Sequence, residues 1–171
     1  MKTLILSALL ACAPALAGDM HEHPKAKPAS AELQQIKGLV GDWKGTAEMG
    51  GKKIDVATSF KLTANGSAVV ETLGAGTPHE MTNVYHDVDG QLTMTHYCAV
   101  GNAPVIKVTK SDGKTLSLAA VAANGIDPKK TPHMHSLTYS FPAKDKMTAT
   151  WASANMGPEN EKPSTFEYTR R

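Results

Sequence analysis

The pattern of apolar and polar positions changes along the chain, and the change divides it into a short helix and a long β region. Between residues 30 and 40, Leu33, Ile36, Leu39 and Val40 recur at helical spacing, which predicts an amphipathic helix that Ser30 caps and Gly41 ends. From residue 43, short alternating runs are separated by turn residues and predict β-strands. We expect about ten strands, at residues 43–49, 52–63, 67–74, 80–87, 91–99, 105–110, 114–122, 133–141, 146–153 and 164–170.

Turn signals connect these strands in sequence order. Asn65-Gly66, Asp89-Gly90 and Asp112-Gly113 are pairs that favour tight hairpins, and consecutive hairpins build an antiparallel meander. A flat meander of ten strands leaves two open edges, whereas closure removes both. The predicted fold class is therefore all-β: a closed antiparallel up-and-down β-barrel of about ten strands, preceded by a short N-terminal helix, in one domain spanning residues 30–171.

The first residues predict export. Lys2 precedes an apolar run from Leu4 to Ala13, and Ala15-Leu16-Ala17 supplies the small residues expected before a cleavage site. We expect residues 1–17 to be a signal peptide and the protein to be periplasmic or secreted. The alternative is a lipoprotein anchored through Cys12. No later segment reaches the roughly 20 apolar residues of a transmembrane helix.

Residues 18–29 predict a disordered tether, because GDMHEHPKAKPA has no apolar periodicity and carries two prolines. His21 and His23 lie in it. Two imidazoles can collect zinc or copper weakly, but they complete no coordination shell, so a polar tail is the favoured interpretation of the pair.

Charge and motifs exclude several classes of function. The net charge is +2, and the basic residues form no stripe, so nucleic-acid binding is not expected. The sequence has no nucleophile elbow, no glycine-rich phosphate loop and no Cys-x-x-Cys pair, and Glu71 is the one acid expected to face inward. We therefore expect no enzymatic activity.

The segment 77–98 is the principal candidate for a site. A two-residue turn at Asp89-Gly90 sets Val88 opposite Gln91, and alternation then collects polar and apolar side chains on one face. That face comprises His79, Met81, Asn83, Tyr85, Met94, His96 and Cys98. Such a mixture is typical of the wall of a ligand cavity or of a metal site.

A second candidate lies on the strand at residues 133–141. Alternation places His133 and His135 on the same face as Leu137, Tyr139 and Phe141, which predicts that both imidazoles point inward. The predicted ligand-binding residues are His79, Met81, Asn83, Tyr85, Met94, His96, Cys98, His133, His135 and Tyr139.

Two features resemble the calycin barrels, the group of lipocalins, fatty-acid-binding proteins and nitrobindins. Gly41-Asp42-Trp43 follows the helix, and Tyr168-Thr169-Arg170-Arg171 lies on the last strand, where a terminal arginine can cover the Trp43 ring. The segments 77–81, 95–98 and 133–135 are similar to motifs of exported bacterial calycin-like proteins of unassigned function. The resemblance implies the fold. Nitrobindins bind haem through a late-strand histidine, for which no position here is a match.

Three interpretations use the same inward positions. His96, Cys98, His133 and His135 are the candidate ligands of a metal, with zinc or copper expected before haem. Alternatively, the histidines hydrogen-bond a small molecule in a cavity, or they satisfy one another in a structural network. We expect an exported protein that binds a small apolar or amphipathic ligand in its interior, with a periplasmic metal- or haem-binding barrel as the alternative.

Overall fold

The computed structural model describes residues 27–158 and 160–171. The predicted signal peptide, the Cys12 anchor, the His21 and His23 pair and most of the predicted tether lie outside the described residues.

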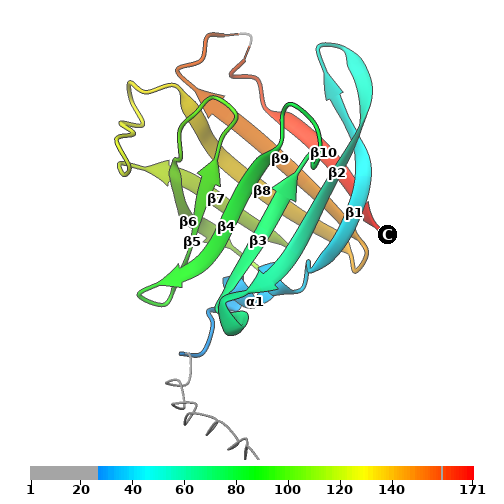
Figure 1. Cartoon of the computed structure of the whole chain (residues 1–171), viewed down its shortest axis with the longest axis vertical. Helices are drawn as coiled ribbons and strands as arrows, with labels where there is room; N and C mark the ends of the chain where they lie inside the picture. Colours follow the sequence, from blue (N-terminus) through cyan, green and yellow to red (C-terminus); the bar gives the residue numbers. More distant parts are fainter. Residues whose placement is uncertain (1–26, 159) are drawn as a thin grey trace, which may run out of the picture.

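The described chain forms a closed antiparallel barrel of ten strands (Figure 1), which confirms the predicted fold class. Each strand pairs with its neighbours in sequence, and the last strand returns to pair with the first. The elements are α1 (Ala31–Lys37), β1 (Gly41–Met49), β2 (Lys52–Thr63), η1 (Ala64–Gly66), β3 (Ala68–Leu73), β4 (Met81–Val88), β5 (Gln91–Tyr97), β6 (Val105–Ser111), β7 (Thr115–Val121), β8 (His133–Ala143), β9 (Lys146–Ala154) and β10 (Ser164–Arg170).

The bounds of β2 and β10 match the prediction, and the ends of the other strands differ from it by one or two residues; the end of the helix and the β2–β3 connection differ more. Helix α1 ends at Lys37, with Gly38 as its C-cap, rather than running to Val40. Gly41 instead opens β1, with a φ of 126° that favours glycine. The β2–β3 connection is the turn η1, in which Asn65 adopts a φ of 51°, rather than a two-residue hairpin.

Closure of the barrel depends on a close approach between β1 and β10. Their register runs from Trp43 opposite Arg170 to Ala47 opposite Phe166, with Gly45 in the middle. A Cβ atom at Gly45 would lie 1.8 Å from the backbone oxygen of Glu167. Glycine is therefore required at this position for the two strands to pair.

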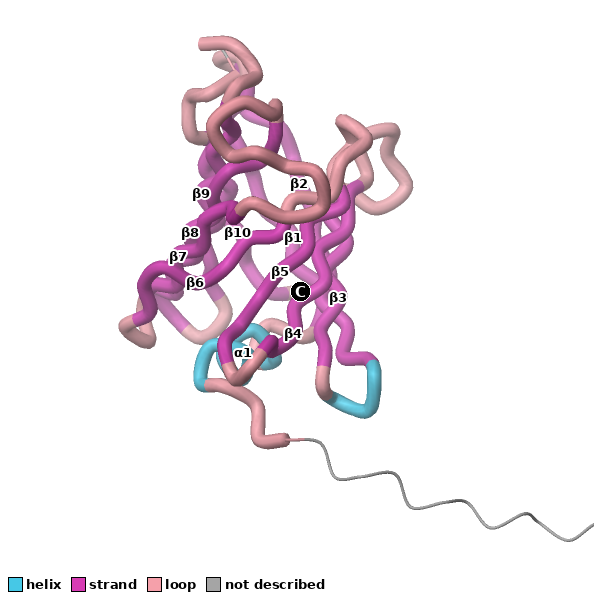
Figure 2. The backbone as a smooth tube through the Cα atoms, turned by 90° about the vertical axis from the view of Figure 1, so that its left-hand side faces the viewer, coloured by secondary structure: helices cyan, strands magenta, loops and turns pink. Residues whose placement is uncertain are grey.

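Helix α1 closes one end of the barrel (Figures 1 and 2). Leu33 and Ile36 of the helix and Leu39 just after it are buried in the core with Trp43 of β1, whereas Val40, which was expected in the same stripe, is 40 % exposed. Ser30 fixes the start of the helix, since its backbone N–H and its hydroxyl both donate to the Asp87 carboxylate at 2.7 Å. The buried residues of the predicted amphipathic helix thus form an apolar floor at this end of the barrel.

Arg170 fastens the segment after α1 to the barrel. Its guanidinium lies 4.3 Å from the centroid of the Trp43 ring and donates to the carbonyl oxygens of Val40 and Gly38, each at 2.7 Å. The Trp43 indole N–H donates to the Leu39 oxygen at 2.8 Å. This geometry confirms that a terminal arginine covers Trp43.

The opposite end of the barrel is bordered by loops rather than by a helix (Figures 1 and 2). Four half-buried apolar side chains lie on the strands near these loops, and we call them the rim residues: Leu73, Met81, Met134 and Phe166. The two ends are thus unlike, one covered by α1 and the other lined by partly accessible apolar groups. Among the described residues, no helix has the length and apolar character needed to cross a membrane.

Candidate functional site

The barrel interior contains a hydrogen-bonded polar network around Glu71, whose side chain is 1 % exposed. Oε1 accepts from the Thr58 hydroxyl at 2.9 Å. Oε2 accepts from Asn83 Nδ2 at 2.6 Å, from the Tyr85 hydroxyl at 2.7 Å and from the Tyr139 hydroxyl at 2.9 Å. The two tyrosine oxygens lie 2.8 Å apart. Four side chains therefore converge on one carboxyl group.

Register and barrel closure together assemble this network. On adjacent strands, Glu71 of β3 lies opposite Asn83 of β4, and Tyr85, two residues after Asn83, is buried on the same inward face. Tyr139 comes from β8, which reaches the network only because the sheet closes on itself. The local part of the network follows from alternation, whereas the Tyr139 contact is a tertiary contact.

Burial sets the ionisation of this network. Desolvation raises the pKa of Glu71 above its ordinary value, and the hydrogen bonds from Tyr85, Asn83, Thr58 and Tyr139 oppose that rise. Desolvation and the neighbouring carboxyl group raise the pKa of both tyrosines well above 10. The tyrosine hydroxyls therefore stay protonated and act as donors.

His96 extends the network through Asn83. Its Nδ1 lies 2.6 Å from Asn83 Oδ1, and its ring is tilted against Trp151 with centroids 5.1 Å apart. The side chain is fully buried, and Nε2 has no hydrogen-bond partner among the protein atoms. Burial lowers the pKa of His96 to about 4. At neutral pH His96 is an uncharged imidazole with one unpaired ring nitrogen.

The hairpin register matches the prediction over its paired part: Val88 lies opposite Gln91, Tyr85 opposite Met94 and Asn83 opposite His96. Met94 is fully buried in the core cluster. β5 ends at Tyr97, so Cys98 lies just beyond the ladder and is half-buried. The same predicted register would place Met81 opposite Cys98, but this pair is not formed as part of the sheet.

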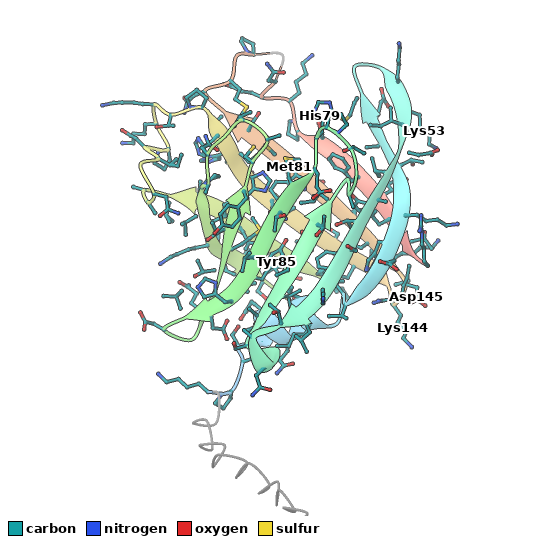
Figure 3. All side chains as sticks on the ribbon, in the orientation of Figure 1. Lys53, His79, Met81, Tyr85, Lys144 and Asp145 are labelled. Atoms are coloured by element: carbon teal, nitrogen blue, oxygen red, sulfur yellow. The ribbon has the colours of Figure 1, made fainter. Side chains whose placement is uncertain are left out.

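His79 does not lie on the inner face, which corrects the prediction. It is exposed, in the β3–β4 loop near the end of the barrel (Figure 3). The loop is folded by the Thr77 hydroxyl donating to the Gly74 oxygen at 2.7 Å and by the Glu80 carboxylate accepting from Gly76 N at 2.7 Å. Because these turns precede β4, which begins only at Met81, the alternation of side chains along β4 does not extend back to His79.

His133 and His135 contact each other but do not follow the predicted alternation. The pairing register with β9 shifts between Met134 and Ser136. Because of this irregularity, the simple alternation that would place both histidines on the same face as Leu137 does not hold. His133 Nδ1 lies 2.7 Å from the Thr131 oxygen, so it donates there, and Nε2 then accepts from His135 Nδ1 at 3.2 Å. His133 is buried and His135 half-buried.

The predicted metal ligands are not gathered into one group. Across residues 27–158 and 160–171, no set of three or more His, Cys, Asp or Glu side chains is placed to hold a metal ion. His96 joins Asn83, while His133 and His135 join each other. The donor set that the sequence suggested for zinc or copper therefore does not fit such a site.

Two side chains of the network were missed by sequence reasoning. Thr58 and Trp151 are both buried, and Trp151 reaches His96 only through barrel closure. Glu71 was expected to face inward but was not counted among the site residues. Its position between inward-facing Val69 and Leu73 on β3 was the available signal.

Two surface hollows lie outside the barrel. One is lined by Thr115, Ser140 and Thr148 over β7, β8 and β9, and the other by Thr46 and Lys53 with residues of β10. The level of the Glu71 network is occupied by buried side chains. A ligand that reaches the network from the rim must therefore displace rim side chains.

The sequence matches no family model and no curated protein. The fold and the buried network define the class of protein: a closed, ten-stranded antiparallel up-and-down β-barrel, consistent with a calycin-like fold. A barrel of this kind is compatible with ligand binding.

Proposed function

We propose that this protein binds a small apolar or amphipathic molecule at the rim end of its barrel, and that it acts by binding rather than by catalysis. The observation that carries the proposal is the unpaired, buried Nε2 atom of His96. A buried polar atom without a partner costs about 1 to 3 kcal/mol. A ligand that supplies the missing hydrogen bond recovers that free energy.

The position of His96 favours access from the rim. On the inner face, Met81 lies one inward position beyond Asn83 toward the loops (Figure 3), and Asn83 is paired with His96. Met81 and Met134 are rim residues with flexible, polarisable side chains that adapt to an incoming apolar group. The rim therefore offers an apolar surface on the loop side of the strand pair that holds Asn83 and His96.

Binding is favoured over catalysis by the state of the Glu71 network. Both carboxyl oxygens of Glu71 accept hydrogen bonds from protein side chains. The hydroxyls of Tyr85 and Tyr139 donate to Glu71, and their oxygens lie 2.8 Å apart. These groups therefore use their hydrogen-bonding capacity within the network, and the network stabilises the packing of the interior.

The test uses the neutral fluorescent probe N-phenyl-1-naphthylamine, which brightens in apolar surroundings. We expect saturable brightening with the wild-type protein. Met81→Lys should weaken it at least about tenfold, because a charge at the rim opposes apolar burial. Thr82→Lys, the next residue of β4 on the opposite face, is the matched control and should bind as the wild type does. The proposal would be overturned if neither this probe nor fluorescent probes of several other ligand classes brightened in a saturable way.

Export to the periplasm or the medium is part of the proposal. It is supported by the sequence of residues 1–17, with the small residues Ala15 and Ala17 before Gly18. N-terminal sequencing of protein recovered from outside the cytoplasm tests it. A chain that starts at Gly18 is expected; an acylated chain starting at Cys12 would establish the lipoprotein alternative.

Metal or haem binding remains the alternative function, and no geometry of the described residues favours it. Adjacent imidazoles are found at His133 and His135, but their facing nitrogens are used in a hydrogen bond to each other. Metal analysis of protein purified without a histidine tag, followed by zinc and copper titration, separates the two functions. Stoichiometric metal would favour the alternative.

A further inference from the structure

The hydrogen-bond network determines which nitrogen of His96 carries the proton. Asn83 Nδ2 donates to Glu71 Oε2 at 2.6 Å and lies 3.2 Å from the Tyr85 hydroxyl oxygen. The amide is therefore oriented with Oδ1, an acceptor, facing His96 Nδ1 at 2.6 Å. Because two acceptors cannot share a hydrogen bond, Nδ1 carries the proton. Nε2 is left as a bare acceptor, fully buried and without a protein partner.

The ring of His96 is held in this orientation. Asn83 fixes one edge through the Nδ1 hydrogen bond, and the Trp151 indole contacts the ring with an interplanar angle of 43°. A flip of the imidazole would break the bond to Asn83 and leave Oδ1 unpaired. The acceptor at Nε2 is therefore a fixed feature of the interior.

The charge around His96 opposes an anionic ligand. The buried polar and charged side chains of the described residues are Thr58, Glu71, Asn83, Thr93, His96 and His133. They include one carboxyl group, separated from His96 by a single amide, and no lysine or arginine. His96 itself is uncharged at neutral pH because burial lowers its pKa to about 4. A carboxylate head group would meet no counter-charge here.

We propose that the ligand presents a hydrogen-bond donor without negative charge, a hydroxyl or an amine, to Nε2 of His96. This inference rests on the proposed function and names the chemical class of the polar end. An apolar chain would extend between the rim residues, while the donor reaches the imidazole. A fatty acid, which the resemblance to fatty-acid-binding proteins suggests as a first candidate, is disfavoured by the same geometry.

The test displaces N-phenyl-1-naphthylamine with a series that shares one chain and differs in its head group: dodecanol, dodecylamine, dodecyl methyl ether and dodecanoate. Dodecanol or dodecylamine should bind about tenfold or more tighter than the ether, which lacks a donor, and than the acid anion. A factor of ten is the size expected for one hydrogen bond to a buried acceptor. The comparison between dodecanol and dodecylamine tells whether Glu71 favours a cation.

Variants assign the effect to His96. His96→Phe keeps a ring against Trp151 but removes the acceptor. The affinity for dodecanol should therefore fall to the affinity for the ether, and the affinity for the ether should not change. His86→Phe, on the outer face of β4, is the matched control. If His96→Phe fails to fold, the 15N chemical shift of Nε2 in the wild-type protein provides the readout, and it should move upfield when dodecanol binds.

The outcomes distinguish the two proposals. If no member of the series displaces the probe, the proposed function fails. If all members bind equally, or if dodecanoate binds as tightly as dodecanol, binding stands but the assignment of a donor head group is overturned. An unchanged Nε2 shift at saturating dodecanol also overturns it.

Discussion

Glu71 is the residue on which the interior polar groups converge, and its environment has two opposing effects on its pKa. Burial favours the protonated acid, while donors such as Tyr85 and Asn83 favour the carboxylate. The balance raises the pKa of Glu71. A buried carboxyl group without a cationic partner is stabilised only by its hydrogen bonds, so losing one of these donors is costly.

The raised pKa of Glu71 predicts a pH-dependent stability. As pH rises above about 4.5, the unfolded chain releases this proton before the folded protein does, so the contribution of Glu71 to stability falls. The difference in unfolding free energy between wild type and Glu71→Gln should therefore shrink with rising pH. Urea denaturation from pH 4.5 to 8 measures it. Glu167→Gln, at an exposed position of β10, is the control, and a difference that grows with pH would contradict the assignment.

His96 predicts the opposite slope. Its folded pKa of about 4 lies below the ordinary value of 6.5, so between these values the unfolded chain binds a proton that the folded protein does not. Stability is then lost as pH falls from 6.5 toward 4, by about 2 to 3 kcal/mol. Denaturation curves of His96→Phe should lack this loss, whereas those of His79→Phe, an exposed position, should retain it. Equal acid slopes in all three proteins would rule out a buried neutral His96.

Strands β1 and β10 close the sheet, and Gly45 controls how near they come. Substituting Gly45 with alanine places a Cβ atom against the backbone of Glu167, which no side-chain rotation relieves. We expect Gly45→Ala to lower the free energy of unfolding by roughly 2 to 4 kcal/mol, as overpacking against backbone does. Thr46→Ala, on the outer face of the same strand, should cost less than about 1 kcal/mol. Equal losses in urea denaturation would show that closure tolerates a side chain here.

Trp43 connects α1, β1 and β10, and its ring is 1 % exposed. Trp43→Ala should destabilise the fold by roughly 3 to 5 kcal/mol, as losses of large buried aromatics do. Tyr97→Ala, at an aromatic residue that is 53 % exposed, serves as the control and should cost much less. A loss below about 1 kcal/mol for Trp43→Ala in chemical denaturation would mean that the covered end does not depend on this residue.

At the scale of the whole molecule, the barrel has one covered end and one end lined by accessible apolar groups. Cys98 is half-buried and lies just after β5, near the loops that border the rim. It thus reports on the end where a ligand is proposed to enter. Among the described residues, no cysteine lies at the covered end, so a reporter there has to be introduced.

Occupation of the rim should slow alkylation of Cys98. In a Cys12→Ser background, we expect saturating N-phenyl-1-naphthylamine or dodecanol to lower the rate of maleimide labelling at least severalfold, since ligand bound near the rim hinders the reagent. Labelling of a cysteine introduced at Lys144, in the β8–β9 turn at the other end (Figure 3), should be unaffected. Equal slowing at both positions would indicate a general effect of the probe rather than a rim site.

Alternation and turn residues predicted most of the fold. The bounds of β2 and β10 and the pairing of Asn83 with His96 follow from local pattern, because side chains alternate with a period of two and turn pairs set the register. The same pattern failed at His79, where a folded loop replaced the strand, and at His135, where a register shift interrupted alternation. Such irregularities depend on how neighbouring strands meet.

The sequence by itself determined the helix, the ten strands, their order and the arginine over Trp43, since each follows from periodicity, turn chemistry or the adjacency of first and last strands. Only the tertiary structure decided which polar groups meet. Tyr139 reaches Glu71 across 68 residues of chain, Trp151 meets His96 from β9, and the predicted metal ligands stay in separate places. The physical reason is that pattern fixes the face on which a side chain lies, whereas curvature and closure of the sheet fix its distance from side chains on other strands.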